Sequence, residues 1–224
     1  EEEYADRLYR FTSESEQKEM RLRIYSNVAY YYYMKSAFQA SVQLTEKAIS
    51  LAQELRDTLA WSDNLAQQSI SYQRLGNLEM AIRTTLDRLY LDSLLQDTLR
   101  LRSTYNNLAD LYLTAQRPED GKQYIDHAIE LEHSQAHPEK LSIRYGMAAE
   151  LYVKLGLLPE ALDFACKAYA LDMKSGDTLK IARRLSQMGD VYAAMQNLDE
   201  AEKVYRKSSE LLELLDERTS LAIN

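Results

Sequence analysis

Apolar positions recur along the chain at two spacings, three or four residues within a segment and forty residues between segments. The first spacing is that of an amphipathic α-helix. The second is marked by the triplet Asp-Thr-Leu, which begins at Asp57, Asp97 and Asp177 and whose aspartate suits the N-cap of a helix. Where a fourth copy is missing, His137-Pro138 offers another helix start, because proline fits the first helical position. The frame predicts five repeats, at 17–56, 57–96, 97–136, 137–176 and 177–216.

Two columns of this frame are the same in all five repeats, since the sixteenth residue is tyrosine and the thirty-fifth is leucine. Small residues stand three positions before each tyrosine and nine after it, which lets helix backbones approach closely. Gly, Asn or Pro between these small columns marks a turn in four repeats. Each repeat is therefore predicted to be a hairpin of two helices, over about positions 2 to 18 and 22 to 36. The invariant columns are predicted to be structural: Tyr32, Tyr72, Tyr112, Tyr152, Tyr192, Leu51, Leu91, Leu131, Leu171 and Leu211.

This arrangement resembles the tetratricopeptide repeat (TPR) family in its long-helix form, since each repeat has 40 residues rather than about 34. The resemblance rests on a large residue that opens each first helix, on the two small columns and on the tyrosine column. A further column is mostly small, and Arg88 departs from it. Its other members are Ala48, Ala128, Ala168 and Ser208.

The resemblance implies an all-α solenoid, a right-handed superhelix of stacked antiparallel hairpins with a concave face lined mainly by the first helices. One hairpin cannot bury its apolar face alone, so stacking is also expected on physical grounds. Residues 1–16 fit the end of a preceding second helix, and 217–224 fit the start of a further first helix. The whole chain, 1–224, is then a single array, and its acidic start without an initiator methionine indicates an excerpt of a longer protein.

Four consecutive tyrosines, Tyr30 to Tyr33, cannot all face a core, because successive helix residues point about 100° apart. Tyr32 belongs to the structural column. Tyr30, Tyr33 and Met34 fall at the phases that face the binding groove in the family, with packing against a preceding repeat as the alternative. The same phases predict the rest of the groove, with an ordinary solvated surface as the alternative: Ile70, Gln73, Arg74, Asn106, Asp110, Leu113, Glu150, Val153, Arg183 and Asp190.

Composition and motifs limit the kinds of partner, metal site and reaction that the chain is expected to support. The chain has 27 Lys+Arg and 35 Asp+Glu, a net charge of −8, which argues against nucleic-acid binding by this region. No apolar run approaches the roughly 18 residues of a membrane span, so no membrane contact is expected. The single cysteine, Cys166, has no partner for catalysis, and Pro138 disrupts the helical spacing that His133 and His137 would need to bind a metal. Trp61 is expected to pack on the preceding hairpin.

No phosphate loop, zinc-protease pair, serine-hydrolase elbow or calcium loop occurs, so neither catalysis nor a cofactor is predicted. The predicted partner is a protein or peptide segment. The long-helix form occurs in motor-associated adaptors and bacterial regulators, which implies the sensor or interaction region of a signalling or transcriptional regulatory protein. One alternative is a module that dimerises, or docks on an output domain of the same chain, without a separate ligand. A second is an RNA-binding solenoid. The location stays open between the cytoplasm and a bacterial periplasm.

Overall fold

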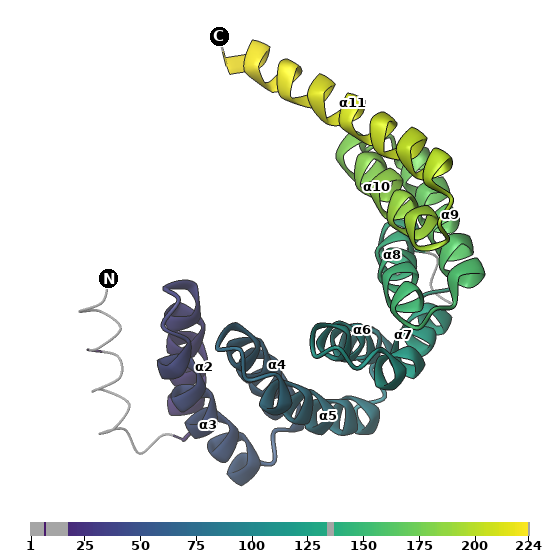
Figure 1. Cartoon of the computed structure of the whole chain (residues 1–224). Helices are drawn as coiled ribbons and strands as arrows, with labels where there is room; N and C mark the ends of the chain where they lie inside the picture. Colours follow the sequence, from purple (N-terminus) through teal and green to yellow (C-terminus); the bar gives the residue numbers. More distant parts are fainter. Residues whose placement is uncertain (1–6, 8–17, 134–136, 224) are drawn as a thin grey trace. The chain divides into compact units, whose positions relative to one another are not determined.

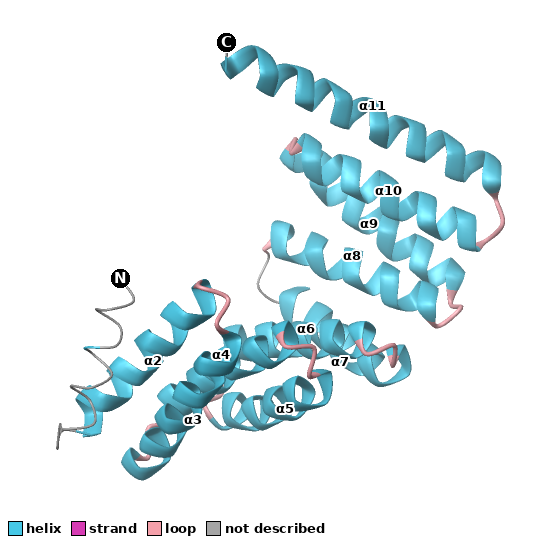
Figure 2. Ribbon diagram, turned by 60° about the vertical axis from the view of Figure 1, so that its left-hand side comes forward, coloured by secondary structure: helices cyan, strands magenta, loops and turns pink. Residues whose placement is uncertain are grey.

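The computed structural model describes residue 7 and residues 18–133 and 137–223. Over these ranges it consists of ten α-helices with no strand (Figures 1 and 2). The first helices of the hairpins are α2 (Lys18–Met34), α4 (Thr58–Arg74), α6 (Thr98–Thr114), α8 (Pro138–Lys154) and α10 (Thr178–Ala194). The second helices are α3 (Phe38–Leu55), α5 (Leu78–Leu94), α7 (Pro118–His133), α9 (Leu158–Ser175) and α11 (Leu198–Ile223). The predicted all-α class of stacked helical hairpins is confirmed.

The chain divides into two compact units, Glu1–Ala115 and Gln116–Asn224, called the N-terminal unit and the C-terminal unit below. Helices α2 to α6 belong to the first and α7 to α11 to the second. Within each unit every helix packs on the next one along the chain, and the first helices of adjacent hairpins also touch, α2 with α4 and α8 with α10. Packing between neighbours in sequence is typical of a solenoid. That the two units continue one array stays a prediction.

Helix starts lie where the repeat predicts them, at positions 2 and 22 of each repeat. The expected N-caps are confirmed, because the carboxylates of Asp57, Asp97 and Asp177 accept hydrogen bonds from backbone N–H groups of the first turn. Helices α3, α5, α7 and α9 run one to three residues beyond the predicted end. The ends of the second helices are harder to predict than their starts, since the starts follow a turn marked by Gly, Asn or Pro in four repeats and no residue type marks the ends.

The turn inside each hairpin uses one backbone conformation, with a left-handed residue at position 20 of the repeat. Glycine supplies it without strain at Gly76 and Gly156, whose φ angles are 75° and 72°. Repeats 1, 3 and 5 adopt the same conformation with side chains present, at Ser36, Gln116 and Gln196. The same turn therefore forms with and without glycine, which only removes the strain of the left-handed conformation.

One predicted boundary is wrong. Residues 217–223 do not begin a further helix but continue α11, which has 26 residues. Repeats 2, 3 and 5 begin with an N-cap aspartate, whereas the corresponding position here is Glu217, a helix former and a poor cap. The helix therefore has no signal to stop. The preceding helix expected at 1–16 lies outside the described residues, apart from residue 7.

The structural columns supply much of the core. Tyr112 and Tyr152 are buried, and Tyr32, Tyr72 and Tyr192 are half-buried, so each ring packs while its edge stays near the surface. In the leucine column Leu91 is buried and the others are half-buried. The small column explains the close helix packing: a Cβ at Gly189 would overlap the ring of Tyr205. These columns hold the first helices in register and so position their outward-facing residues.

Candidate functional site

The first helices carry all thirteen residues that the sequence predicts for the groove. In each unit, the side of the first helices that carries them is called the helix-A face below. None of the thirteen is fully buried. Six are exposed: Tyr30, Met34, Arg74, Glu150, Arg183 and Asp190. Seven are half-buried: Tyr33, Ile70, Gln73, Asn106, Asp110, Leu113 and Val153. All of them therefore keep some surface for a partner.

The tyrosine run at the start of the N-terminal unit separates into exposed and packed members. Tyr30 and Met34 are 55% and 61% exposed, which leaves them available for contact. Tyr33 instead packs against Phe38 across the hairpin turn, with 5.7 Å between the ring centroids. The alternative of packing against a preceding repeat falls on residues outside the described ranges.

A hydrogen bond joins two predicted residues on neighbouring first helices of this unit. Gln73 Nε2 on α4 donates to Asp110 Oδ2 on α6 over 3.1 Å. The bond holds both side chains in place on the helix-A face. It also occupies one of the acceptor sites of the Asp110 carboxylate. A partner at this position would meet a preorganised amide and carboxylate rather than two mobile side chains.

In the C-terminal unit the structure brings three predicted residues into one cavity of about 280 Å³ between α8 and α10. Glu150, Val153 and Asp190 line it, whereas Arg183 does not. The other lining residues are Ala149, Lys154, Gln187 and Val191. The cavity combines an apolar wall with charges of both signs. It is slightly smaller than the roughly 300–1,000 Å³ of small-ligand pockets, so one or two side chains of a bound segment suit it.

One wall of this cavity is held by a hydrogen bond from the last hairpin. The hydroxyl of Tyr205 donates to Asp190 Oδ1 over 2.6 Å. Burial and the neighbouring Asp190 carboxylate raise the pKa of Tyr205 to about 12, so the phenol stays protonated and remains a donor. The ring reaches Asp190 because it lies directly over Gly189, where no Cβ stands in the way.

A larger cavity in the N-terminal unit was missed by the sequence reasoning. It has about 650 Å³, lies between α2 and α4, and is lined by none of the predicted residues. Polar side chains one turn earlier on the same helices line it instead, including Arg23, Asn27, Asp63 and Gln67. Asn27 and Gln67 both occupy position 11 of their repeats. That recurring amide was the available signal.

A sequence profile for the tetratricopeptide repeat matches residues 103–133 and 182–211. These segments lie in repeats 3 and 5 of the frame, the first over parts of α6 and α7 and the second over parts of the packed helices α10 and α11. The chain therefore contains tetratricopeptide repeats in these two segments. No curated protein sequence matches it significantly.

Solved structures share the TPR fold at low sequence identity. BtubC from P. vanneervenii is 18% identical, with a TM-score of 0.78 over 95% of this chain and 88% of that one. The signal transduction ATPase with numerous domains (STAND) from Pyrococcus horikoshii, which has a tetratricopeptide repeat sensor, is 20% identical, with a TM-score of 0.79 over 89% of this chain and 31% of that one. The apo form of RapI is 15% identical, with a TM-score of 0.72 over 93% and 89%. At these identities the likeness establishes the fold alone.

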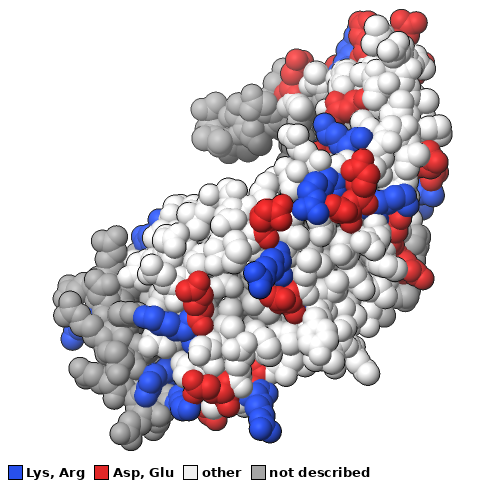
Figure 3. Space-filling model, turned by 60° about the horizontal axis from the view of Figure 1, so that its bottom comes forward, with Lys and Arg blue, Asp and Glu red and all other residues white. Residues whose placement is uncertain are grey.

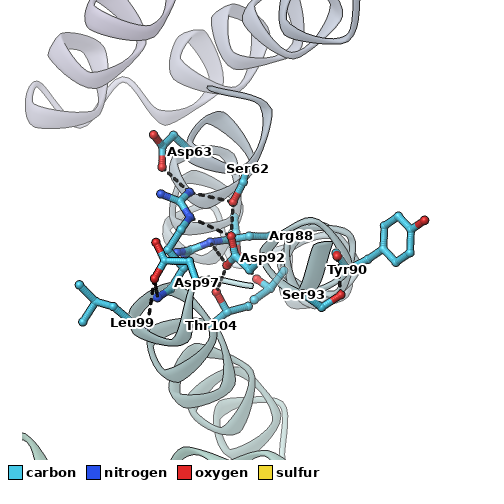
Figure 4. Close-up of polar contacts among 12 residues, drawn as sticks. Ser62, Asp63, Arg88, Tyr90, Asp92, Ser93, Asp97, Leu99 and Thr104 are labelled. Carbon is cyan, nitrogen blue, oxygen red and sulfur yellow. Dashed lines mark hydrogen bonds and ion pairs between the residues drawn. The ribbon is translucent and has the colours of Figure 1, made fainter. Parts of the chain in front are cut away.

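Between its repeats, the TPR protein buries carboxylates that the sequence reasoning did not single out. Asp92 is fully buried at the end of α5 (Figure 4). Its Oδ1 accepts from Ser62 and Arg100, and its Oδ2 accepts from Thr104. Arg88, the exception in a column of small residues, lies 3.2 Å from the same carboxylate. The positive charge of Arg88 neutralises the buried carboxylate of Asp92, which explains why this column has an arginine in repeat 2.

The same position of the next two TPR hairpins repeats this arrangement. Glu132 lies 3.2 Å from Arg144, and Asp172 accepts from Arg184 over 2.9 Å, both between position 36 of one repeat and position 8 of the next. Gly146 makes room for the second pair, since a Cβ there would overlap the guanidinium of Arg184. The sequence shows the acids at position 36 and the arginines at position 8, but it does not indicate that they form ion pairs. These pairs fix the stacking of the hairpins.

The Asp92 cluster predicts how stability depends on pH. Burial alone would raise the pKa of Asp92, but hydrogen bonds from Ser62, Thr104 and Arg100 and the charge of Arg88 outweigh it and hold the pKa below 3.8. The carboxylate therefore stabilises the fold fully above that value and loses its contribution as the pH falls through the lower, folded-state pKa. We expect the difference in unfolding free energy between the natural chain and Asp92→Asn to be large at neutral pH and to shrink at about pH 3. Urea unfolding at both pH values measures it, and a difference that does not change with pH would contradict the assignment.

The described residues give little support for a metal site, a reactive thiol, a membrane-spanning helix or a patch of one charge. Within residues 18–133 and 137–223, no group of three His, Cys, Asp or Glu side chains is placed to hold a metal ion. Burial and the nearby Asp163 raise the pKa of the exposed Cys166, which disfavours the reactive thiolate. No described helix has both the length and the apolar character needed to cross a membrane. On the face shown in Figure 3, Lys and Arg lie beside Asp and Glu rather than forming a patch of one sign.

Proposed function

We propose that this TPR protein is a non-enzymatic scaffold that binds a peptide or protein segment on its helix-A face. The cavity between α8 and α10 is the observation that carries the proposal, because it gathers Glu150, Val153 and Asp190 around an apolar wall. Such a pocket takes an anchoring side chain, and the surrounding exposed polar residues add complementarity. The TPR family is generally a protein-interaction scaffold, which supports the same reading.

The place of this scaffold in a larger system is also a proposal. The STAND protein from Pyrococcus horikoshii is described as having a tetratricopeptide repeat sensor, and this chain covers 31% of it. We infer that the chain acts in the same way, as the sensing or interaction region of a signalling or regulatory protein. Such a region recognises a segment of a partner and passes the binding energy to a module outside the described residues.

A peptide selection tests the proposed site. Random peptides displayed on phage are selected on the intact chain, and the enriched peptides are measured by fluorescence anisotropy. We expect Val153→Arg to raise their dissociation constants by about tenfold or more, because a guanidinium on the apolar wall fills the cavity between α8 and α10.

The matched control is Ala170→Arg, which adds the same side chain at an exposed position of α9, away from the helix-A face. We expect it to leave the peptide affinities unchanged. Both variants must unfold at the same urea concentration as the natural chain. No enrichment, or equal loss with both variants, would overturn the proposed site.

A further inference from the structure

The N-terminal unit has a second kind of cavity, on the side of the hairpins away from the helix-A face. It has about 330 Å³, with α4 as its floor and α3 and α5 as its walls. Trp61, Leu65 and Tyr72 line the floor, Ile49 lines one wall and Met80 the other. The cavity is within the range of small-ligand pockets and offers aromatic and aliphatic surface.

Two of the three charged side chains that line this cavity are acidic. Glu46 on α3 and Asp87 on α5 line the two walls, and Arg83 is the single cationic lining residue. Glu46 and burial raise the pKa of Tyr72, with burial the larger cause, so this phenol is neutral. The charged lining groups therefore carry one carboxylate in excess, beside aromatic rings that attract cations.

Gln68 places an amide on the floor of this cavity. Its side chain lines the cavity and is 7% exposed. A carboxamide carries both a donor and an acceptor. A ligand in the cavity therefore meets a polar group on an otherwise aromatic and aliphatic floor.

Other repeats show what normally occupies this place. In repeat 4, Lys167 lies 5.9 Å from the ring of Tyr145 and 5.5 Å from the ring of Phe164, so the chain's own ammonium sits over aromatic rings. In repeat 1, Lys47 lies 5.8 Å from the ring of Tyr25 in the same way. Both lysines occupy position 31 of their repeats.

Repeat 2 reverses this arrangement. Its position 31 is Asp87, a carboxylate, and its position 28 is Thr84, where repeat 4 has the bulky Phe164. The lysine of position 31 and the ring of position 28 are thus absent from repeat 2, and position 9, which is tyrosine in repeats 1 and 4, is Leu65. Arg83 supplies the cationic group of the cavity lining. Trp61 and Tyr72 remain to receive a cation from outside.

We propose that the cavity lined by Trp61, Gln68 and Tyr72 binds an organic cation, an alkyl ammonium or guanidinium group whose apolar stem lies on the floor. Glu46 and Asp87 pair with the charged head, and the amide of Gln68 supplies a hydrogen bond. The cation comes either from a free amine or from a lysine or arginine side chain of a partner. Arg83 competes with it for the carboxylates.

Trp61 is the only tryptophan of the chain, so the tryptophan fluorescence comes from a residue that lines this cavity. The intact chain is titrated with n-butylammonium, n-butylguanidinium and neutral n-butanol, and with capped Gly-Lys-Gly and Gly-Arg-Gly peptides. We expect saturable changes with the cations, at about millimolar affinity for such small probes, and none with n-butanol. Binding of the capped peptides together with weak or absent binding of the free amines identifies a partner side chain as the source. Binding of the free amines at equal or higher affinity identifies a small molecule.

Variants that each remove one charged lining group test whether binding depends on the sign of the charges around the cavity. Glu46→Gln and Asp87→Asn are each expected to raise the dissociation constant about fivefold, whereas Arg83→Gln is expected to lower it about threefold. Glu130→Gln, on an exposed carboxylate of α7 outside the cavity, is the control and is expected to change nothing. A response to n-butanol equal to that of the cations, no response to any cation, or the same effect from Arg83→Gln and Glu46→Gln would overturn the proposal.

Discussion

Replacing Asp92 with alanine is expected to lower the free energy of unfolding by about 3–5 kcal/mol. Asp92 is fully buried, and Arg88 beside it is 8% exposed. Without the carboxylate, the guanidinium of Arg88 keeps its charge in a place that water reaches poorly, and the hydroxyls of Ser62 and Thr104 lose their acceptor. Most of the lost stability comes from the guanidinium and the hydroxyl groups that the substitution leaves unpaired. Urea denaturation followed by far-ultraviolet circular dichroism measures it.

The chain itself supplies a control for this prediction. Repeat 1 has Ala48 and Ala52 where repeat 2 has Arg88 and Asp92, and both alanines are fully buried. The double variant Arg88→Ala, Asp92→Ala copies that arrangement and removes both charges together. We expect it to be more stable than Asp92→Ala alone, because no buried charge is left uncompensated. A double variant that loses the sum of the two single losses would show that the pair acts independently, against this account.

Replacing Tyr112 with alanine is the second large effect, about 3–5 kcal/mol of unfolding free energy. Tyr112 is the buried member of the tyrosine column in α6, with 7% of its surface exposed. Truncation removes the ring from a packed interior and leaves a cavity that its neighbours fill only in part. Thermal and urea unfolding of the intact chain detect the loss.

Tyr30→Ala is the matched control for this truncation. Tyr30 is also a helical tyrosine, but it is 55% exposed on α2. Its removal is expected to change the stability by less than about 0.5 kcal/mol. Equal losses for Tyr30→Ala and Tyr112→Ala would mean that the tyrosine column does not form the core.

Local signals in the sequence determined the helices. The helical period and the aspartates that cap α4, α6 and α10 depend on residues close in the chain. The forty-residue recurrence extends these signals to the repeats without such a cap, and together they predicted the helix starts. The small columns and the invariant Tyr and Leu columns predicted which helix sides pack, because a solenoid gives the same position the same environment in each repeat. The end of α11 was mispredicted, since Glu217 replaces the cap that the recurrence led us to expect.

Tertiary structure alone decided which side chains meet. Asp92 and Thr104 are twelve residues apart, and so are Asp172 and Arg184, on helices whose distance and rotation no local pattern specifies. The cavities depend on the same geometry, because one side chain of different size opens or fills them, as Thr84 and Phe164 do at one position. Periodicity therefore fixes the direction of a side chain from its own helix, whereas its partner depends on how neighbouring helices pack.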